Sequence, residues 1–111
     1  MKLVIVWKTA NEIDINNFVV PYAYNSKKQG WFDDVEVLIW GASQEVVVNN
    51  SIVKQRVSNL VKNEISVFAC KMCADNVNAT EVLESIGVKV FYTGQYLTEQ
   101  IKDKDTEVIY L

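Results

Sequence analysis

The stretch ISVFACKMCAD, residues 65–75, decides the fold of this chain. Its first five residues are apolar at almost every position, and the next six leave that pattern and carry two cysteines three positions apart. A short apolar run without polar alternation is typical of a strand buried on both faces of a parallel sheet. The sequence therefore predicts that a buried strand ends at the cysteines and passes directly into a helical turn.

Four further runs of the same kind are spread along the chain. They are KLVIVW (2–7), VEVLIW (35–40), VKVFY (88–92) and EVIYL (107–111). Segments with apolar residues at helical spacing lie between them. Strands that alternate with helices predict an α/β fold, a three-layer α/β/α sandwich around a five-stranded, mainly parallel sheet. At 111 residues, half of them hydrophobic, the chain fits a single domain, residues 1–111.

The first helical segment contains the chain's single proline. Pro21 interrupts an apolar stripe, so we expect it to kink the helix or to restart it with proline in the first turn. The stripe consists of Ile15, Phe18, Val19, Tyr22 and Ala23.

Three later helices are expected from their caps and apolar faces. One begins after Asn50 or Ser51 as the N-cap, and another begins after a capping box formed by Asn78 and Glu81. The last follows Thr93 and is expected to bury Tyr96, Leu97 and Ile101.

Charge and composition exclude several classes of partner. The 14 acidic and 11 basic residues are spread along the sequence, and clustered Lys and Arg, which nucleic-acid binding requires, are missing. The first residues, MKLVIVWKTANE, contain too short an apolar core for a signal peptide or a membrane span. We therefore expect a cytoplasmic protein with no nucleic-acid or membrane partner.

The residues that follow each strand are the candidates for a functional site, because ligands of open parallel sheets bind where strands end and helices begin. The cysteines are assigned a chemical role, and the other residues are expected to contact substrate. The candidates are Cys70 and Cys73 for the chemistry, and Lys8, Gly41, Ser43, Lys71, Thr93 and Gly94 for the substrate.

Cys70 has a physical reason to be reactive. A thiol at the start of a helical turn faces unpaired backbone N–H groups, which favour the thiolate and lower the thiol pKa. Lys71 would act in the same direction, and Asp75 would oppose it. The alternative is that Cys70 is a small buried core residue, and Cys73 is equally open to a core role.

The residues that the chain lacks narrow the chemistry. Without histidine, the usual imidazole general base is missing, so hydrolysis is not expected. One chain offers only two thiolates to zinc, so a structural site would need two protomers to share the ion, and we expect neither a metal nor another cofactor. A disulfide staple is not expected in a reducing compartment. A thiolate can still attack sulfur, because thiol exchange needs no further proton abstraction.

Cys-x-x-Cys after a strand and before a helix is also the setting of the thioredoxin motif. Against that interpretation, the thioredoxin site includes a cis-proline that faces the cysteines. The only proline of this chain, Pro21, lies far upstream in a helical segment. Two alternatives to sulfur transfer nevertheless remain. One is a dithiol redox protein, and the other is a non-catalytic module that binds a small ligand or assembles with other chains.

The pattern VFACKMCA (67–74), followed by LESIGVKVFYTGQYLTEQI (83–101), resembles the DsrE/DsrF-like family of small sulfur-relay proteins. The loop WGAS (40–43) is similar to that family's glycine-containing loop after the second strand. The resemblance covers nearly the whole chain in layout, and its specific part is residues 65–101.

The resemblance implies a five-stranded parallel α/β/α domain that assembles into homo-oligomers. It also implies that Cys70, the match to the family's active cysteine, carries sulfur as a persulfide and passes it between donor and acceptor proteins. The Cys-x-x-Cys spacing departs from the better-understood members, so the identity of donor and acceptor, and a resolving role for Cys73, stay open.

Overall fold

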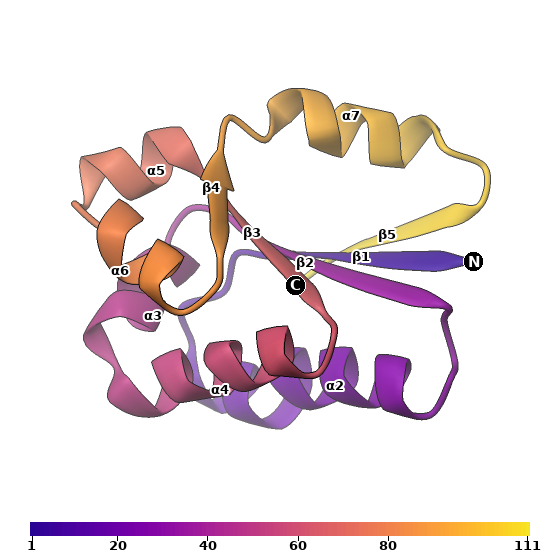
Figure 1. Ribbon diagram of the computed structural model, residues 1–111, viewed down its shortest axis with the longest axis horizontal. Coiled ribbons are helices and arrows are strands. Elements are labelled where there is room, and N and C mark those ends of the chain that lie inside the picture. Colours follow the sequence, from indigo (N-terminus) through magenta and orange to yellow (C-terminus); the bar gives the residue numbers. More distant parts are fainter.

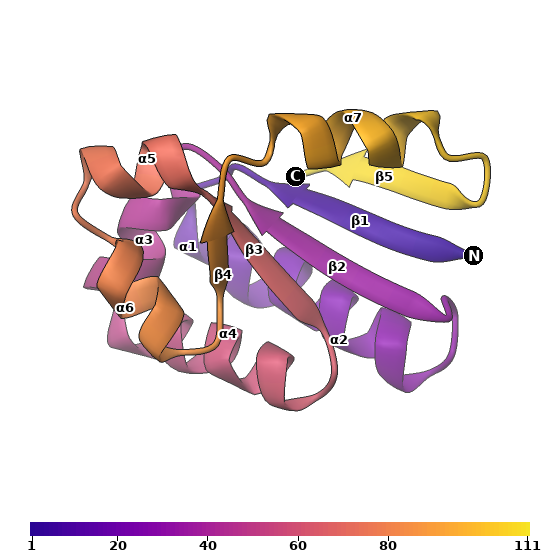
Figure 2. The ribbon, with the colours of Figure 1, turned by 45° about the horizontal axis from the view of Figure 1, so that its top comes forward.

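The computed structural model describes residues 1–111, and its centre is a five-stranded sheet in which every neighbouring pair is parallel. The strands follow the order β4-β3-β2-β1-β5, and Figure 2 shows them side by side. Each begins and ends within one residue of its predicted run, which confirms the strand predictions. Their bounds are β1 Lys2–Trp7, β2 Asp34–Ile39, β3 Ser66–Cys70, β4 Lys89–Phe91 and β5 Thr106–Tyr110.

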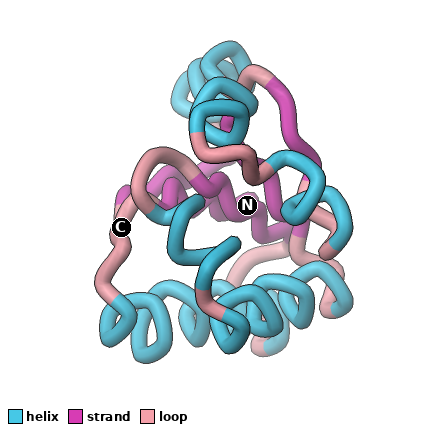
Figure 3. Tube along the Cα trace, turned by 90° about the vertical axis from the view of Figure 1, so that its left-hand side faces the viewer, coloured by secondary structure: helices cyan, strands magenta, loops and turns pink.

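Helices cover both faces of this sheet, so the protein is the predicted three-layer α/β/α sandwich. Figure 1 shows α2 and α4 below the sheet and α5 and α7 above it, and the end view in Figure 3 shows the strands between two helical layers. The helices are α1 Glu12–Asp14, the π-helix η1 Ile15–Val19, α2 Val20–Lys28, α3 Ser43–Asn49, α4 Ser51–Lys62, α5 Lys71–Asn76, α6 Thr80–Ser85 and α7 Gly94–Lys102. No helix is both long and apolar enough to cross a membrane.

The main hydrophobic core lies between the sheet and the α2/α4 layer. Alternate residues of the three central strands point into it, since successive side chains of a strand lie on opposite faces. They meet apolar side chains of both helices. The strand residues are Leu3, Ile5, Trp7, Val35, Val37, Ile39, Val67 and Ala69, and the helical ones include Val20, Ala23, Val53, Val57 and Leu60.

The opposite face of the sheet is covered much less completely. Helix α7 has no buried residue, and Ile101, which we expected to be buried, is 54% exposed. The reason is that α7, which connects β4 to β5, packs on the sheet mainly through one aromatic cluster over β3 and β4. Tyr96 contacts Phe68 and Phe91 in edge-to-face geometry, with ring centroids 5.1 and 6.1 Å away.

The proline produces the restart that the sequence suggested. The N–H of Val20 bonds the carbonyl of Ile15, which closes a π-turn, and Pro21 then lies in the first turn of α2. Proline is tolerated there because its missing N–H has no partner to lose in a first turn.

The predicted N-cap is confirmed for α4 and is wrong for α6. Asn50 caps α4 as predicted, and its Oδ1 accepts from the N–H groups of Ile52 and Val53, both at 3.0 Å. The capping box at Asn78 is wrong. Asn78 adopts a left-handed conformation with φ 54°, and Ala79 becomes the N-cap of α6 without a side-chain bond.

Candidate functional site

The two cysteines lie at the carboxyl edge of the sheet, as the sequence predicted. Cys70 is the last residue of β3 and pairs with Phe91, the last residue of β4. Its side chain points to the α7 face, and Thr93 follows β4 by two residues and is the N-cap of α7. Gly41, in the loop after β2, presents its backbone N–H to Cys73. The fold therefore gathers four of the predicted site residues at one place.

Cys70 is buried, at 4% exposure, yet its surroundings lower the pKa of its thiol. Burial raises the pKa of the thiol, but the N–H of Cys73, the hydroxyl of Thr93, the thiol of Cys73 and the N–H of Met72 together lower it by more. The N–H groups are available because Cys70 is the N-cap of α5, where the first turn has no intrahelical partners. The net result is a pKa below the ordinary value.

Cys73 behaves in the opposite way. It is the third residue of α5 and is half-buried. Burial and the neighbouring Cys70 raise its pKa, and the N–H of Gly41 offsets only part of the effect. The pair is therefore asymmetric, because the surroundings lower the pKa of the Cys70 thiol and raise the pKa of the Cys73 thiol.

Thr93, predicted as a substrate contact, acts on the thiol of Cys70. Its side chain is fully buried, and its Oγ1 has no hydrogen-bond partner of good geometry. A neutral thiol is a weak acceptor, so the hydroxyl gains a strong partner only when Cys70 ionises. The hydroxyl thus lies near enough to Cys70 to lower the pKa of the thiol, and its geometry falls short of a full hydrogen bond.

Ser43 has a clear structural task beside this site. Its hydroxyl lies 2.7 Å from the carbonyl oxygen of Trp7 and 3.2 Å from that of Trp40, so it ties together the chain segments that leave β1 and β2. It is fully buried. A substrate contact by Ser43 stays a prediction, and the structure gives its hydroxyl a scaffolding partner.

Gln44 was missed by sequence reasoning. It is fully buried, and its Nε2 donates to the carbonyl oxygens of Cys70 at 3.0 Å and Ile39 at 3.3 Å. It therefore fixes the backbone at the end of β3 against the end of β2. The sequence held little signal for this role, because a glutamine just inside a helix is ordinarily exposed.

The remaining predicted residues surround the cysteines less closely. Lys71 forms an ion pair with Asp75, with 3.0 Å between Nζ and Oδ2, and is not among the groups that lower the Cys70 pKa. Lys8 is exposed beyond β1. Gly94 is the exposed first residue of α7, with open space where a Cβ would lie.

Two further observations limit the chemistry of the site. No three side chains among the acids and cysteines lie close enough to hold a metal ion. None of the hollows on the surface is lined by Cys70 or Cys73. Cys73 is the more exposed residue of the two.

The fold and the site define an α/β protein with a five-stranded parallel sheet and an asymmetric pair of thiols at the carboxyl end of β3. Among solved structures, the chain is similar to the conserved protein of unknown function BT1422 from Bacteroides thetaiotaomicron. The two are 31% identical, superpose with a TM-score of 0.94, and match over 99% of this chain and 94% of that chain. The chain belongs to the same family as that protein.

This family membership establishes the fold and brings no activity with it. No family profile matches the sequence, and no curated protein matches it. The resemblance to the DsrE/DsrF-like family therefore stays a hypothesis, carried by layout and by residues 65–101.

Proposed function

We propose that this protein is a sulfur carrier that holds sulfane sulfur as a persulfide on Cys70. The observation that carries the proposal is the selective stabilisation of the Cys70 thiolate by Thr93 and the backbone N–H groups of α5. A thiolate of lowered pKa is the form of cysteine that attacks sulfur, and it needs no histidine to prepare it.

The transfer is balanced without any other reactant. The Cys70 thiolate attacks the outer sulfur of a donor persulfide R–S–SH, the S–S bond of the donor breaks, and R–S⁻ leaves. Cys70–S–SH remains, and the same exchange with an acceptor thiolate returns Cys70 to its starting state. The N–H groups that stabilise the thiolate would equally stabilise the anionic persulfide.

A dithiol redox function is the second candidate, and the contact between the two thiols supports it. In that reaction Cys70 attacks a substrate disulfide and releases one thiol. Cys73 then displaces the second thiol and leaves a Cys70–Cys73 disulfide. The high pKa of Cys73 disfavours this second step until its proton is lost.

A non-catalytic module with the same fold is the third candidate. The 4% exposure of Cys70 supports it, because an inert core cysteine is usually buried. The lowered pKa of Cys70 argues the other way, since a purely structural thiol gains nothing from aligned N–H groups.

The test compares the wild type with Cys70→Ser and Cys73→Ser. Each reduced protein is alkylated over a range of pH, and each is separately exposed to a small persulfide donor and weighed by mass spectrometry. The carrier predicts that only proteins that retain Cys70 gain the mass of one sulfur atom, and that Cys70 is alkylated at a lower pH than Cys73.

The other candidates give different results. When a small disulfide is added as the oxidant, a redox protein loses two hydrogens in the wild type, forms a Cys70–Cys73 disulfide with a defined potential and reduces the added disulfide to two thiols, and neither serine variant does so. If neither thiol reacts until the protein unfolds, both the carrier and the redox functions are refuted, and the module remains.

The proposal includes a cytoplasmic setting and sulfur donor or acceptor proteins as partners. It also includes a homo-oligomer, which the apolar side chains exposed on α7, on β5 and in the loop before α7 support. Tyr92 is 69% exposed, Ile101 54% and Tyr110 52%. Light scattering on purified protein measures the oligomer directly, and a strictly monomeric mass would refute this part.

A further inference from the structure

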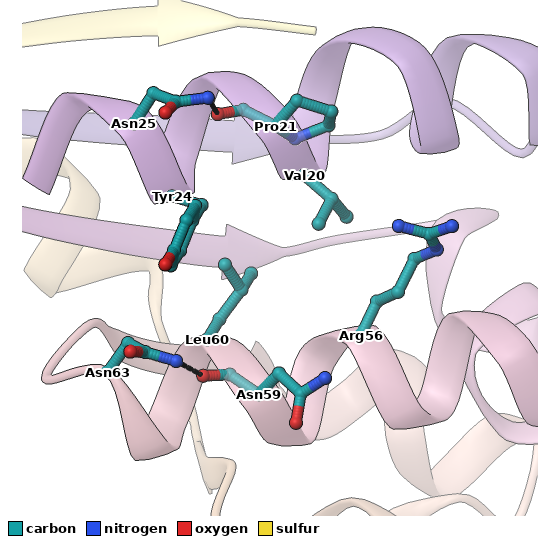
Figure 4. A pocket seen from close by; sticks show the side chains of 8 residues that line it. All are labelled: Val20, Pro21, Tyr24, Asn25, Arg56, Asn59, Leu60 and Asn63. Atoms are coloured by element: carbon teal, nitrogen blue, oxygen red, sulfur yellow. Dashed lines mark hydrogen bonds between the residues drawn. The ribbon is translucent and has the colours of Figure 1, made fainter. Parts of the chain in front are cut away.

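A groove of about 360 Å³ lies between α2 and α4, on the side of the sheet opposite α7. Figure 4 shows Tyr24 and Arg56 toward its two ends and the apolar side chains of Val20 and Leu60 between them. This volume is near the lower end of the range of small-molecule sites, about 300–1,000 Å³. The groove is separate from the cysteines, so a ligand bound there would be independent of the proposed function.

The charge in this groove is the reverse of the charge of the chain. Arg56 is the only arginine, in a protein of net charge −3, and it takes part in none of the ion pairs. No Asp or Glu lines the groove. The groove therefore presents a guanidinium whose hydrogen-bond donors are not taken up by a carboxylate of the protein.

Two amides in the lining have a fixed orientation. The Nδ2 of Asn25 donates to the carbonyl of Pro21 at 2.9 Å, and the Nδ2 of Asn63 donates to the carbonyl of Asn59 at 2.6 Å. A carbonyl oxygen only accepts hydrogen bonds, so each side-chain amide must point its Nδ2 at the carbonyl. The Oδ1 of each amide is then left for another partner. Figure 4 shows these two amides toward the Tyr24 end, away from Arg56.

The groove also begins at the most unusual stretch of backbone in the protein. The π-helix η1 ends at Val19, and the next two residues, Val20 and Pro21, line the groove. π-Turns are rare and are found frequently at functional sites.

We propose that this groove binds a small organic monocarboxylate. The Arg56 fork takes the carboxylate through two parallel hydrogen bonds, and the apolar middle of the groove covers the body of the ligand. The free amide oxygens at the Tyr24 end accept from an N–H or O–H of the ligand. One guanidinium balances one negative charge, which favours a carboxylate over a doubly charged phosphate ester.

The probe is N-acetyl-L-leucine, which has a carboxylate, an apolar body and an amide N–H. Its matched control is N-acetyl-L-leucinamide, which keeps the shape and lacks the charge. Both are titrated into isotope-labelled protein and followed by the amide resonances. We expect saturable shifts around Val20, Tyr24 and Leu60 with the acid, and at least about tenfold weaker binding of the amide.

The variant that tests the groove is Arg56→Gln, and its control is Lys62→Gln, which removes another exposed cation of the same helix outside the groove. Arg56→Gln should weaken the acid by about tenfold or more, and Lys62→Gln should leave it unchanged. Arg56 is exposed, so its variant should keep the wild-type spectrum.

Several results would overturn the proposal. One is the absence of saturable shifts at the groove with the acid. Another is equal binding of acid and amide. The third is equal weakening by Arg56→Gln and Lys62→Gln, which would mean that the acid responds only to overall charge.

Discussion

Replacing Thr93 with valine should make the protein more stable and its key thiol less reactive. Valine keeps the shape of threonine and exchanges the hydroxyl for a methyl group. That hydroxyl is fully buried and has no hydrogen-bond partner of good geometry. It becomes useful only when Cys70 ionises. The two protonation states of one cysteine should therefore respond to the substitution in opposite directions.

The magnitudes differ between the two states. A buried hydroxyl without a partner costs about 1–3 kcal/mol, so its removal should raise the free energy of unfolding by roughly 1 kcal/mol while Cys70 is protonated. A hydrogen bond to a charged group contributes about 1.5–3 kcal/mol, so its loss should disfavour the thiolate by roughly tenfold or more.

The dependence on pH gives the sharper test. The pKa of Cys70 is lowered in the folded protein, so its ionisation contributes stability that is present above the pKa of the unfolded chain and is lost as pH falls through the folded pKa. Thr93→Val should reduce this contribution. In urea unfolding over a pH series, the variant should have a higher free energy of unfolding than the wild type at low pH. This difference should shrink or change sign as pH rises.

The control is the same substitution in a Cys70→Ala background. No thiolate forms there, so Thr93→Val should stabilise by the same amount at every pH. If the wild-type background gives an equally flat difference, and the ultraviolet titration of the thiolate does not move, then Thr93 does not donate to Cys70 and its assigned role in the site is wrong.

Three other substitutions test neighbouring parts of the structure. Gly87→Ala should cost about 2–4 kcal/mol in urea unfolding, since Gly87 has φ +92° and a Cβ would meet Val61 Cγ1 at 2.7 Å. Adding Val61→Ala should relieve the steric share, and an unchanged cost would contradict that interpretation. Lys71→Met should change the alkylation rate of Cys70 by less than about twofold, since its ammonium is already paired; a larger loss would show that it acts on the thiol. Tyr96→Phe should cost about 1 kcal/mol and speed amide exchange in α7, because its hydroxyl bonds a carboxylate of β2. Unchanged exchange would mean that the bond does not hold α7.

The strands were predictable because one physical requirement governs each of them. A parallel sheet covered by helices buries both faces of its strands, so the strands stand out as continuous apolar runs. In KLVIVW, for example, every residue after Lys2 is buried. The order of the strands was open, because nothing in a run of valines and isoleucines says which run lies beside it.

The helices were less predictable, because their ends depend on more than one signal. Helix α3 was not expected at all, and Asn78 resembled a cap while its backbone turned left-handed. A capping residue competes with the turn that the chain needs to reach the next element, and that turn is set by where the neighbouring strand lies. Ile101 was misjudged because α7 packs on the sheet mainly through Tyr96, near its start, and leaves Ile101 in its last turn exposed.

The sequence by itself determined that Cys70 ends a buried strand, and with it the edge of the sheet where the cysteines, Gly41 and Thr93 gather. Only the tertiary structure decided that the pKa of Cys73 is raised and that the hydroxyl of Thr93 helps to lower the pKa of Cys70. The physical reason is how far apart in the sequence the interacting residues lie. Burial along a strand is written into neighbouring residues, but a pKa depends on every dipole and charge within a few ångströms, and those come from parts of the chain far apart in sequence.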